Sequence, residues 1–436
     1  MRVLFLNGKP IISIYQSGRL HLVVALCSAV VSNQAVLTAQ TLREQRTLSL
    51  DSRYFINGYS NKAIGRFGIE MIHLGGLPAS LIFDPDSASD DDEKTFLFYN
   101  ARQLSYIGEG LILLVGSTFF SSPFQLSFHE FGHGTRFAAV GLKPSYGHGL
   151  PAYAPREAKT YDSFFSYYVS SFFHFGGGYT FWDEALFRWP LRAEEFGEWH
   201  AVVSMGGVNN SMFFTEIIED ELYRDGGHLG FASSYVLGKL SAKLYDYSDS
   251  GVNDIDRIIS HFQIRGVDID RKKIQRASIT SFFLSSITYQ FAHQFIRLFM
   301  GESTRFRPWE FYGVQLPNTA FYMTRDGLSY KVRSGYRYES WRFPIAVEHV
   351  FEGKKRTEVS VGAEKQLEKL SVAVETIIGK ELELELELSY RFNDWVRFTS
   401  GLALYDANNL HGERLIPSLQ YGSKYHDVYI RASLAY

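Results

Sequence analysis

The stretch LELELELSYRF, residues 382–392, alternates apolar and polar side chains without interruption. Successive side chains of a β-strand point to opposite faces, so this period of two predicts a strand with one apolar and one polar face. From about Arg307 onward, similar stretches follow one another and are separated by short turns, which predicts an antiparallel meander. The other strands expected are 328–338, 343–351, 357–367, 370–378, 395–405, 414–421 and 425–436.

The number and length of these strands are typical of a small outer-membrane β-barrel. Roughly eight to ten strands of about ten residues match that class. The last strand resembles the C-terminal signature of outer-membrane barrel proteins, because apolar residues occupy every second place and the chain ends in Tyr436. The alternative is a soluble antiparallel sheet that packs its Leu face on a helical domain. We expect the barrel.

The segment before these strands is mainly helical. Residues 111–128 are apolar or small almost throughout, and they predict two buried helices that meet near Pro123. Further helices are expected at 161–175, 199–223 and 281–300. The predicted fold is therefore α+β, with a mainly helical domain at 40–305 and an antiparallel β domain at 306–436.

The first 39 residues have the pattern of an export signal. Arg19 and His21 precede the apolar run 22–31, and small and polar residues follow to Ala39. The run is short for a membrane span. Cys27 is the only cysteine and lies inside this segment, so the mature chain would contain no thiol and no disulfide. We expect an exported protein of the outer membrane or periplasm of a Gram-negative bacterium.

Charge and aromatic content restrict the partners. The net charge is −3, and charged residues make up 21%, so the chain lacks the basic field that nucleic-acid binding requires. Aromatic residues reach 16%, which is high and suits a membrane interface, where a ring presents an apolar body and a polar edge. We predict membrane association and no nucleic-acid partner.

The stretch HEFGH, residues 129–133, has the spacing of a metal site. At positions i and i+4 of a helix, His129 and His133 project from one face and can bind a single Zn²⁺, and Glu130 can act on a water molecule beside it. The competing interpretation is a helix with two hydrogen-bonded histidines. Burying such side chains unpaired among apolar neighbours is costly, and Gly132 and Gly134 weaken the helix, so we favour a zinc site that another element approaches closely.

This motif is similar to that of the HExxH zinc metallopeptidases, and its form resembles both the gluzincins and the site-2 protease group. The resemblance covers about ten residues around His129. It implies His129 and His133 as Zn²⁺ ligands and Glu130 as the catalytic general base and acid. The implied function is a zinc-dependent peptidase of the bacterial cell envelope that hydrolyses peptide bonds with metal-activated water. Its substrate would be a protein or peptide of the envelope.

Such a site needs a third protein ligand. In the predicted helix 199–223, Gly206 and Gly207 would allow a close approach to the histidine helix, and Glu216 is expected on the same face. Glu216 and Asp220 resemble the gluzincin arrangement E-x-x-x-D, in which the Glu is a ligand and the Asp supports it. We therefore predict His129, His133 and Glu216 as the metal ligands.

Two other carboxylates remain candidates for the third ligand. Asp225 precedes Gly226 and Gly227 and is similar to the aspartate–glycine motif of site-2 proteases, but the charged segment 219–224 departs from the apolar lead-in of that family. Glu219 is the third choice. The alternative function is a non-enzymatic outer-membrane barrel or assembly protein that carries a structural or vestigial zinc site.

Overall fold

The computed structural model describes residues 5–6, 9–10, 47–54, 60–83, 99–139, 142–149, 160–174, 177–182, 193–245, 253–393, 395–415 and 424–435. The chain divides into two compact units, Met1–Arg43 and Glu44–Tyr436. In the first unit the described residues form two paired strands, β1 (Phe5–Leu6) and β2 (Lys9–Pro10). The apolar run and Cys27 of the predicted export signal lie outside the described residues. The second unit contains all the features described below.

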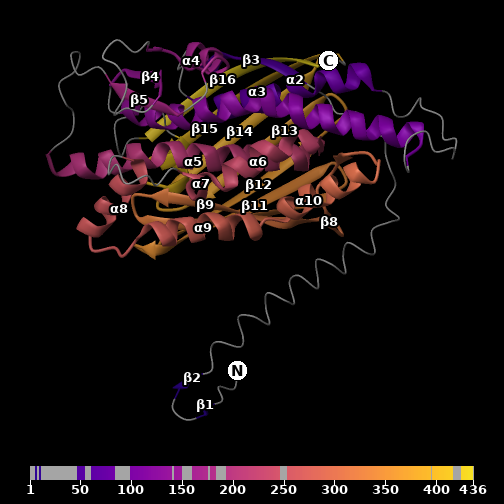
Figure 1. Ribbon diagram of the computed structural model, residues 1–436. Helices are drawn as coiled ribbons and strands as arrows, with labels where there is room; N and C mark the ends of the chain where they lie inside the picture. The colour runs from indigo at the N-terminus through magenta and orange to yellow at the C-terminus, as the bar shows by residue number, and fades with distance from the viewer. Residues whose placement is uncertain are drawn as a thin grey trace. The chain divides into compact units, whose positions relative to one another are not determined.

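The second unit has a helical layer and an antiparallel sheet, which confirms the α+β class (Figure 1). The helical segments are η1 (Ser52–Tyr54), α2 (Asn61–Ile82), α3 (Ala101–Ala139), α4 (Phe164–Ser171), α5 (Ala193–Asp225), η4 (Leu229–Phe231), α6 (Ala232–Lys239), α7 (Ser241–Leu244), α8 (Asp254–Ile264), α9 (Arg271–Phe283), α10 (Ser286–Phe299) and α11 (Leu410–Leu415).

Helix α3 is the longest element and continues through Pro123, so the predicted break at that residue is wrong. A proline inside a helix removes one hydrogen bond and costs about 3 kcal/mol. Packing of α3 against α2 and α5 offsets this cost. By length and composition α3 is the one helix of the described residues that could cross a membrane. Its most apolar 18-residue window has a mean hydropathy of 1.4 and is 33% buried.

The sheet has ten strands, all antiparallel, in the order β3-β16-β15-β14-β13-β12-β11-β10-β9-β8. From β8 to β16 the order follows the sequence, which confirms the predicted meander, and β3 from the start of the unit pairs with β16. The strands are β3 (Thr47–Asp51), β8 (Glu310–Phe311), β9 (Val314–Thr324), β10 (Gly327–Tyr338), β11 (Trp341–Gly353), β12 (Thr357–Gln366), β13 (Leu370–Ile378), β14 (Leu382–Arg391), β15 (Val396–Asp406) and β16 (Lys424–Ala435).

The sheet does not close into a barrel, so that part of the prediction is wrong. Strands β3 and β8 stand at opposite ends of the sheet order and do not pair with each other. Helix α2 contacts the edge strand β3, and α5 and α9 contact β9, the neighbour of the other edge strand. The predicted strand 414–421 also fails at its start, because Arg414 and Leu415 end α11, while 416–423 lie outside the described residues.

The polarity of the sheet is the reverse of that of a soluble sheet packed on helices. In β14 the glutamates face the helical layer, where Lys62 pairs with Glu385 and the Arg66 guanidinium lies 3.0 Å from Glu387. The leucines of the same strand face outward, and Leu388 keeps 47% of its surface exposed. The alternative in which the Leu face packs on the helices is therefore wrong, because α2 presents cations to the sheet and the carboxylates turn toward them.

The apolar core lies within the helical layer and between it and β9. Its largest members are aromatic, and Phe124, Phe128 and Phe214 pack together where α3 meets α5. Two small pairs of strands lie apart from the main sheet: β4 (Pro144–His148) with β5 (Gly178–Trp182), and β6 (Gly227–His228) with β7 (Arg305–Phe306). This core fixes the position of α3 against α5, which is where the predicted motif lies.

Candidate metal centre

Helices α3 and α5 cross at a pair of glycines next to the HEFGH motif. A Cβ atom placed on Gly132 would lie 2.2 Å from the Gly206 carbonyl oxygen, and one on Gly206 would lie 2.3 Å from the Gly132 oxygen. Only glycine permits this distance between backbones. The predicted close approach of the helix that contains Gly206 to the histidine helix is confirmed.

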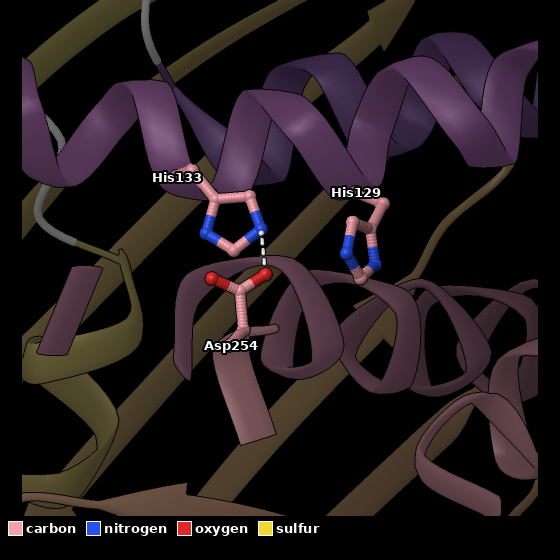
Figure 2. Close-up of side chains that lie close together, drawn as sticks. All are labelled: His129, His133 and Asp254. Carbon is pink, nitrogen blue, oxygen red and sulfur yellow. Dashed lines mark ion pairs between the residues drawn. The ribbon is translucent and has the colours of Figure 1, made fainter. Parts of the chain in front are cut away.

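The two histidines of the motif lie side by side on α3, with ring centroids 5.2 Å apart (Figure 2). The Nδ1 atom of His133 is 2.7 Å from the Val203 carbonyl oxygen and must donate to it. The Nδ1 atom of His129 is 3.2 Å from the Ser211 hydroxyl, which itself donates to the Gly207 oxygen. Both Nδ1 atoms therefore carry the proton when the rings are neutral, and both Nε2 atoms keep a free lone pair for a metal.

Gly207 lets both imidazole rings come close to the backbone of α5. A Cβ atom on Gly207 would lie 2.3 Å from Nε2 of His129 and 2.5 Å from Nε2 of His133. Real Cβ atoms do not approach other atoms so closely, so only glycine at this position leaves room for both rings. Two imidazole nitrogens brought together in this way are donors that a zinc site uses.

Asp254, the first residue of α8, supplies a carboxylate to the same place. One oxygen of Asp254 is 3.2 Å from Nε2 of His133 and accepts a hydrogen bond of 2.7 Å from the Tyr245 hydroxyl. Potential ligand atoms of His129, His133 and Asp254 lie within 4.8 Å of one another. Figure 2 shows the carboxylate facing both rings, with His133 buried and the other two residues half-buried, so the group is not sealed from solvent.

The charges in this group are coupled. Burial lowers the pKa of His129 to about 3, and the neighbouring His133 adds to this effect. Burial would also lower the pKa of His133, but Asp254 and Glu130 outweigh it and raise that pKa to about 9. Burial opposes ionisation of Asp254, yet His133 holds the pKa of this carboxyl below its usual value. One imidazole is therefore neutral and the other forms an ion pair with Asp254.

Glu130 occupies the neighbouring position on α3 and is buried. The Thr180 hydroxyl from β5 lies 2.8 Å from one of its carboxylate oxygens and 2.9 Å from its backbone oxygen. Burial raises the pKa of Glu130 to about 7, although His133 and the contact with Thr180 oppose the shift. The strand pair β4–β5 therefore positions the carboxylate that the resemblance implies as a catalytic base.

The predicted third ligand, Glu216, lies elsewhere. Its carboxylate accepts a hydrogen bond of 2.5 Å from the Tyr322 hydroxyl and one of 2.8 Å from Lys331. Glu216 is nine residues beyond Gly207, which corresponds to about 13 Å along the axis of α5. Gly206 and Glu216 are ten residues apart, so their side-chain directions differ by about 80° around the helix axis. The two residues therefore do not share a face. The structure places Asp254, and not Glu216, beside the two histidines.

The other two candidate carboxylates of α5 are also absent from the histidine group. Glu219 lies 2.9 Å from the Lys239 ammonium and accepts a hydrogen bond from Tyr235. Asp225 ends α5 and lines a charged cavity between α5 and the sheet, and burial together with the charge of Glu221 raises its pKa to about 6. The described residues therefore bring together His129, His133 and Glu130 of the predicted site.

Sequence reasoning missed Asp254 because no local spacing connects it with the motif. The local signal is that of a helix start: Asn253 caps α8 through the Asp256 backbone N–H, and acidic residues favour a first turn. That signal explains an aspartate at this position without any metal. Only the packing of α8 against α5 brings it to the histidines.

No protein-family model matches the chain, and the comparisons with curated proteins and with solved structures found no match. The candidate metal centre therefore rests on the motif and on the geometry of the residues around it.

Proposed function

We propose that this chain is a zinc-dependent peptidase in which His129, His133 and Asp254 bind the metal. The observation that carries the proposal is the convergence of these three donors, whose ligand atoms lie within 4.8 Å of one another, with Glu130 on the adjacent position of α3. Two imidazoles and one carboxylate form a donor set that catalytic zinc sites use, and three protein ligands leave a position open. A structural zinc site would be closed by a fourth protein ligand.

Bound there, zinc would supply Lewis acidity to a water molecule and to the scissile carbonyl group. Glu130 takes the proton from the attacking water and returns it to the leaving amine, and its contact with Thr180 keeps the carboxylate oriented. Ser211 and the Val203 carbonyl hold the two imidazoles with Nε2 toward the metal position. The substrate we propose is a protein or peptide of the bacterial cell envelope, in line with the N-terminal export pattern.

The test uses the purified full-length chain, its metal content measured by mass spectrometry, and cleavage of a peptide library. In Glu130→Gln we expect the wild-type zinc content and a rate lowered by about 10²- to 10⁴-fold, because the general base is lost. In His133→Ala we expect loss of both zinc and cleavage. Glu109→Gln is the matched control, because Glu109 lies on the same helix but pairs with Arg305 at 2.7 Å.

Undiminished cleavage in Glu130→Gln would remove the enzyme proposal and leave a structural metal site. A wild-type chain that binds no zinc at all would remove the metal centre as well. The same three donors can also bind Fe²⁺. Iron in the purified chain together with no peptide cleavage would therefore count against the peptidase and favour a different chemistry at the same residues.

A further inference from the structure

The outward face of the sheet is apolar over most of its width. Six residues on five strands illustrate this, since each is exposed and each lies between its strand's two ends: Ile345, Val361, Val372, Leu386, Val428 and Ile430. The fully outward members are strongly exposed, with 70% of Val428 and 64% of Ile430 accessible. A contiguous apolar surface of this extent marks a site that contacts another protein or a membrane.

The inward face of the same strands is charged. Between the sheet and the helices lies a cavity of about 210 Å³ lined by ionisable side chains. In its lining, Arg431 lies 3.4 Å from Glu387, and Arg224 lies 3.2 Å from Glu364. A water-soluble protein buries its apolar residues and exposes its charges, whereas the strands of outer-membrane proteins turn apolar residues outward and polar residues inward. This sheet has the second arrangement although it is not closed.

Aromatic residues gather at one end of the outward face. Tyr338 and Trp341 are paired at the turn between β10 and β11, and Tyr390 and Trp395 flank the turn between β14 and β15. All four rings are at least partly exposed, and the Lys365 ammonium lies 4.7 Å above the Trp341 ring. Trp and Tyr rings concentrate at the level of lipid headgroups, where a nearby lysine extends to water.

The dimensions of the strands fit the same interpretation. Strands β10 to β16 are nine to thirteen residues long. A tilted strand needs about nine to eleven residues to cross the hydrocarbon core of a bilayer. At the end of the sheet away from the aromatic rings, the turns contain exposed Lys354, Lys355 and Lys380, which belong in water.

A second apolar surface lies on α3, in the helical layer that covers the other side of the sheet (Figure 1). Leu111, Val115 and Phe119 are spaced by four residues and form one exposed stripe, with Val115 67% exposed. A second copy of the chain stacked on the sheet would leave this stripe in water. A bilayer surrounds the molecule and covers both surfaces at once.

We propose that the hydrocarbon core of a lipid bilayer covers the outward face of β10 to β16 and the exposed stripe of α3. The aromatic end of the sheet then lies at one headgroup region and the lysine-containing turns at the other. The charged cavity and the metal centre lie inside this apolar boundary. The inference does not depend on the proposed peptidase, because it uses none of the residues of the metal centre.

The test places a polarity-sensitive fluorophore on single cysteines of the full-length chain, with Cys27→Ser as the background. The sites are Leu386→Cys and Ile430→Cys on the sheet, Val115→Cys on α3, and Lys380→Cys in a turn as the control. The labelled proteins are reconstituted in phosphatidylcholine vesicles with and without lipids that carry a quencher halfway along the acyl chain. Circular dichroism confirms that each variant is folded.

For the three apolar sites we expect blue-shifted emission and a fluorescence loss to below about half with the quenching lipid, because these sites contact the hydrocarbon core. The Lys380→Cys label should respond to iodide in water instead. Water-like emission at Leu386→Cys and Ile430→Cys would overturn the proposal. Shielding of these two labels from both quenchers in a dimeric protein would also overturn it and assign the sheet face to a second copy of the chain.

Discussion

The two halves of α5 have different surroundings: the first half packs against the histidines of α3, and the second half carries buried carboxylates. The first half, up to Ser211, packs on α3 through Gly206 and surrounds the histidines with small side chains and backbone carbonyls. The second half, from Glu216 onward, carries five acidic residues, and three of them, Glu216, Glu219 and Asp220, have cations and hydroxyl groups of the sheet and of α6 as partners. A metal ligand needs a carboxylate that is free to exchange its partner. The carboxylates of Glu216, Glu219 and Asp220 already pair with cations, and the carboxylate beside the two histidines comes from α8.

Among the variants that distinguish the two halves of α5, we expect the largest effect, a loss of folding stability, from Lys331→Met. Lys331 and Glu216 are both buried and 2.8 Å apart, so removal of the ammonium leaves a buried carboxylate with less compensation. Breaking such a pair costs about 3 kcal/mol of folding free energy. Urea unfolding should show this loss, while the folded protein keeps its zinc, because the first half of α5 is unchanged.

The control for this variant is Lys143→Met. Lys143 and Asp162 are also 2.8 Å apart, but both are about half exposed, and exposed pairs contribute less than about 1 kcal/mol. An equal, small loss in both variants would show that Glu216 is not a buried charge. Loss of zinc in Lys331→Met would place Glu216 back at the metal centre.

The next effect is on zinc affinity, and it distinguishes Asp254, the third ligand that we propose from the structure, from Glu216, the third ligand predicted from the sequence. Asp254→Asn replaces a charged donor by a weak neutral one, and we expect the dissociation constant for zinc to rise by about 100-fold or more. Glu216→Gln keeps its size and should bind zinc as the wild type does. Competition with a chromophoric chelator measures both constants. A weakened Glu216→Gln with an unchanged Asp254→Asn would restore the gluzincin arrangement of ligands.

These contrasts show what local sequence can predict. Patterns that span only a few residues agree with the structure. They are the HEFGH spacing on a helix, the glycines that allow the helix crossing, and the period of two in β14. The identity of the third carboxylate depends on which of several acids meets cations from distant strands. Glu216 meets Lys331 and Asp254 does not, and that difference arises from tertiary packing.

The same limit explains the errors about the sheet. The alternation in residues 382–392 predicts a strand with two unlike faces, but it does not say which face the helices cover. That depends on Lys62 and Arg66 of α2, which pair with Glu385 and Glu387. Barrel closure is likewise not a property of any one strand, since it depends on whether the two edge strands, β3 and β8, pair with each other.

The smallest expected effect comes from Ser211→Ala, which changes the support of one histidine and leaves every proposed ligand in place. The Ser211 hydroxyl accepts the Nδ1–H of His129 while its own proton goes to the Gly207 carbonyl, so it fixes Nε2 toward the metal position. Loss of such a supporting contact lowers metal affinity by about 10-fold. His133 should be unaffected, because its partner is the backbone oxygen of Val203.

Ser204→Ala is the matched control, because Ser204 is buried on the same helix and its hydroxyl makes no hydrogen bond within the described part of the chain. We expect chelator competition to give the wild-type zinc affinity for this variant. If Ser211→Ala also bound zinc as the wild type does, the orientation of His129 would depend on packing against the Tyr245 ring, whose centroid is 6.0 Å away. The first half of α5 would then support His133 alone by a hydrogen bond, and its role at the metal centre would be mainly to let both imidazole rings approach its backbone at Gly207.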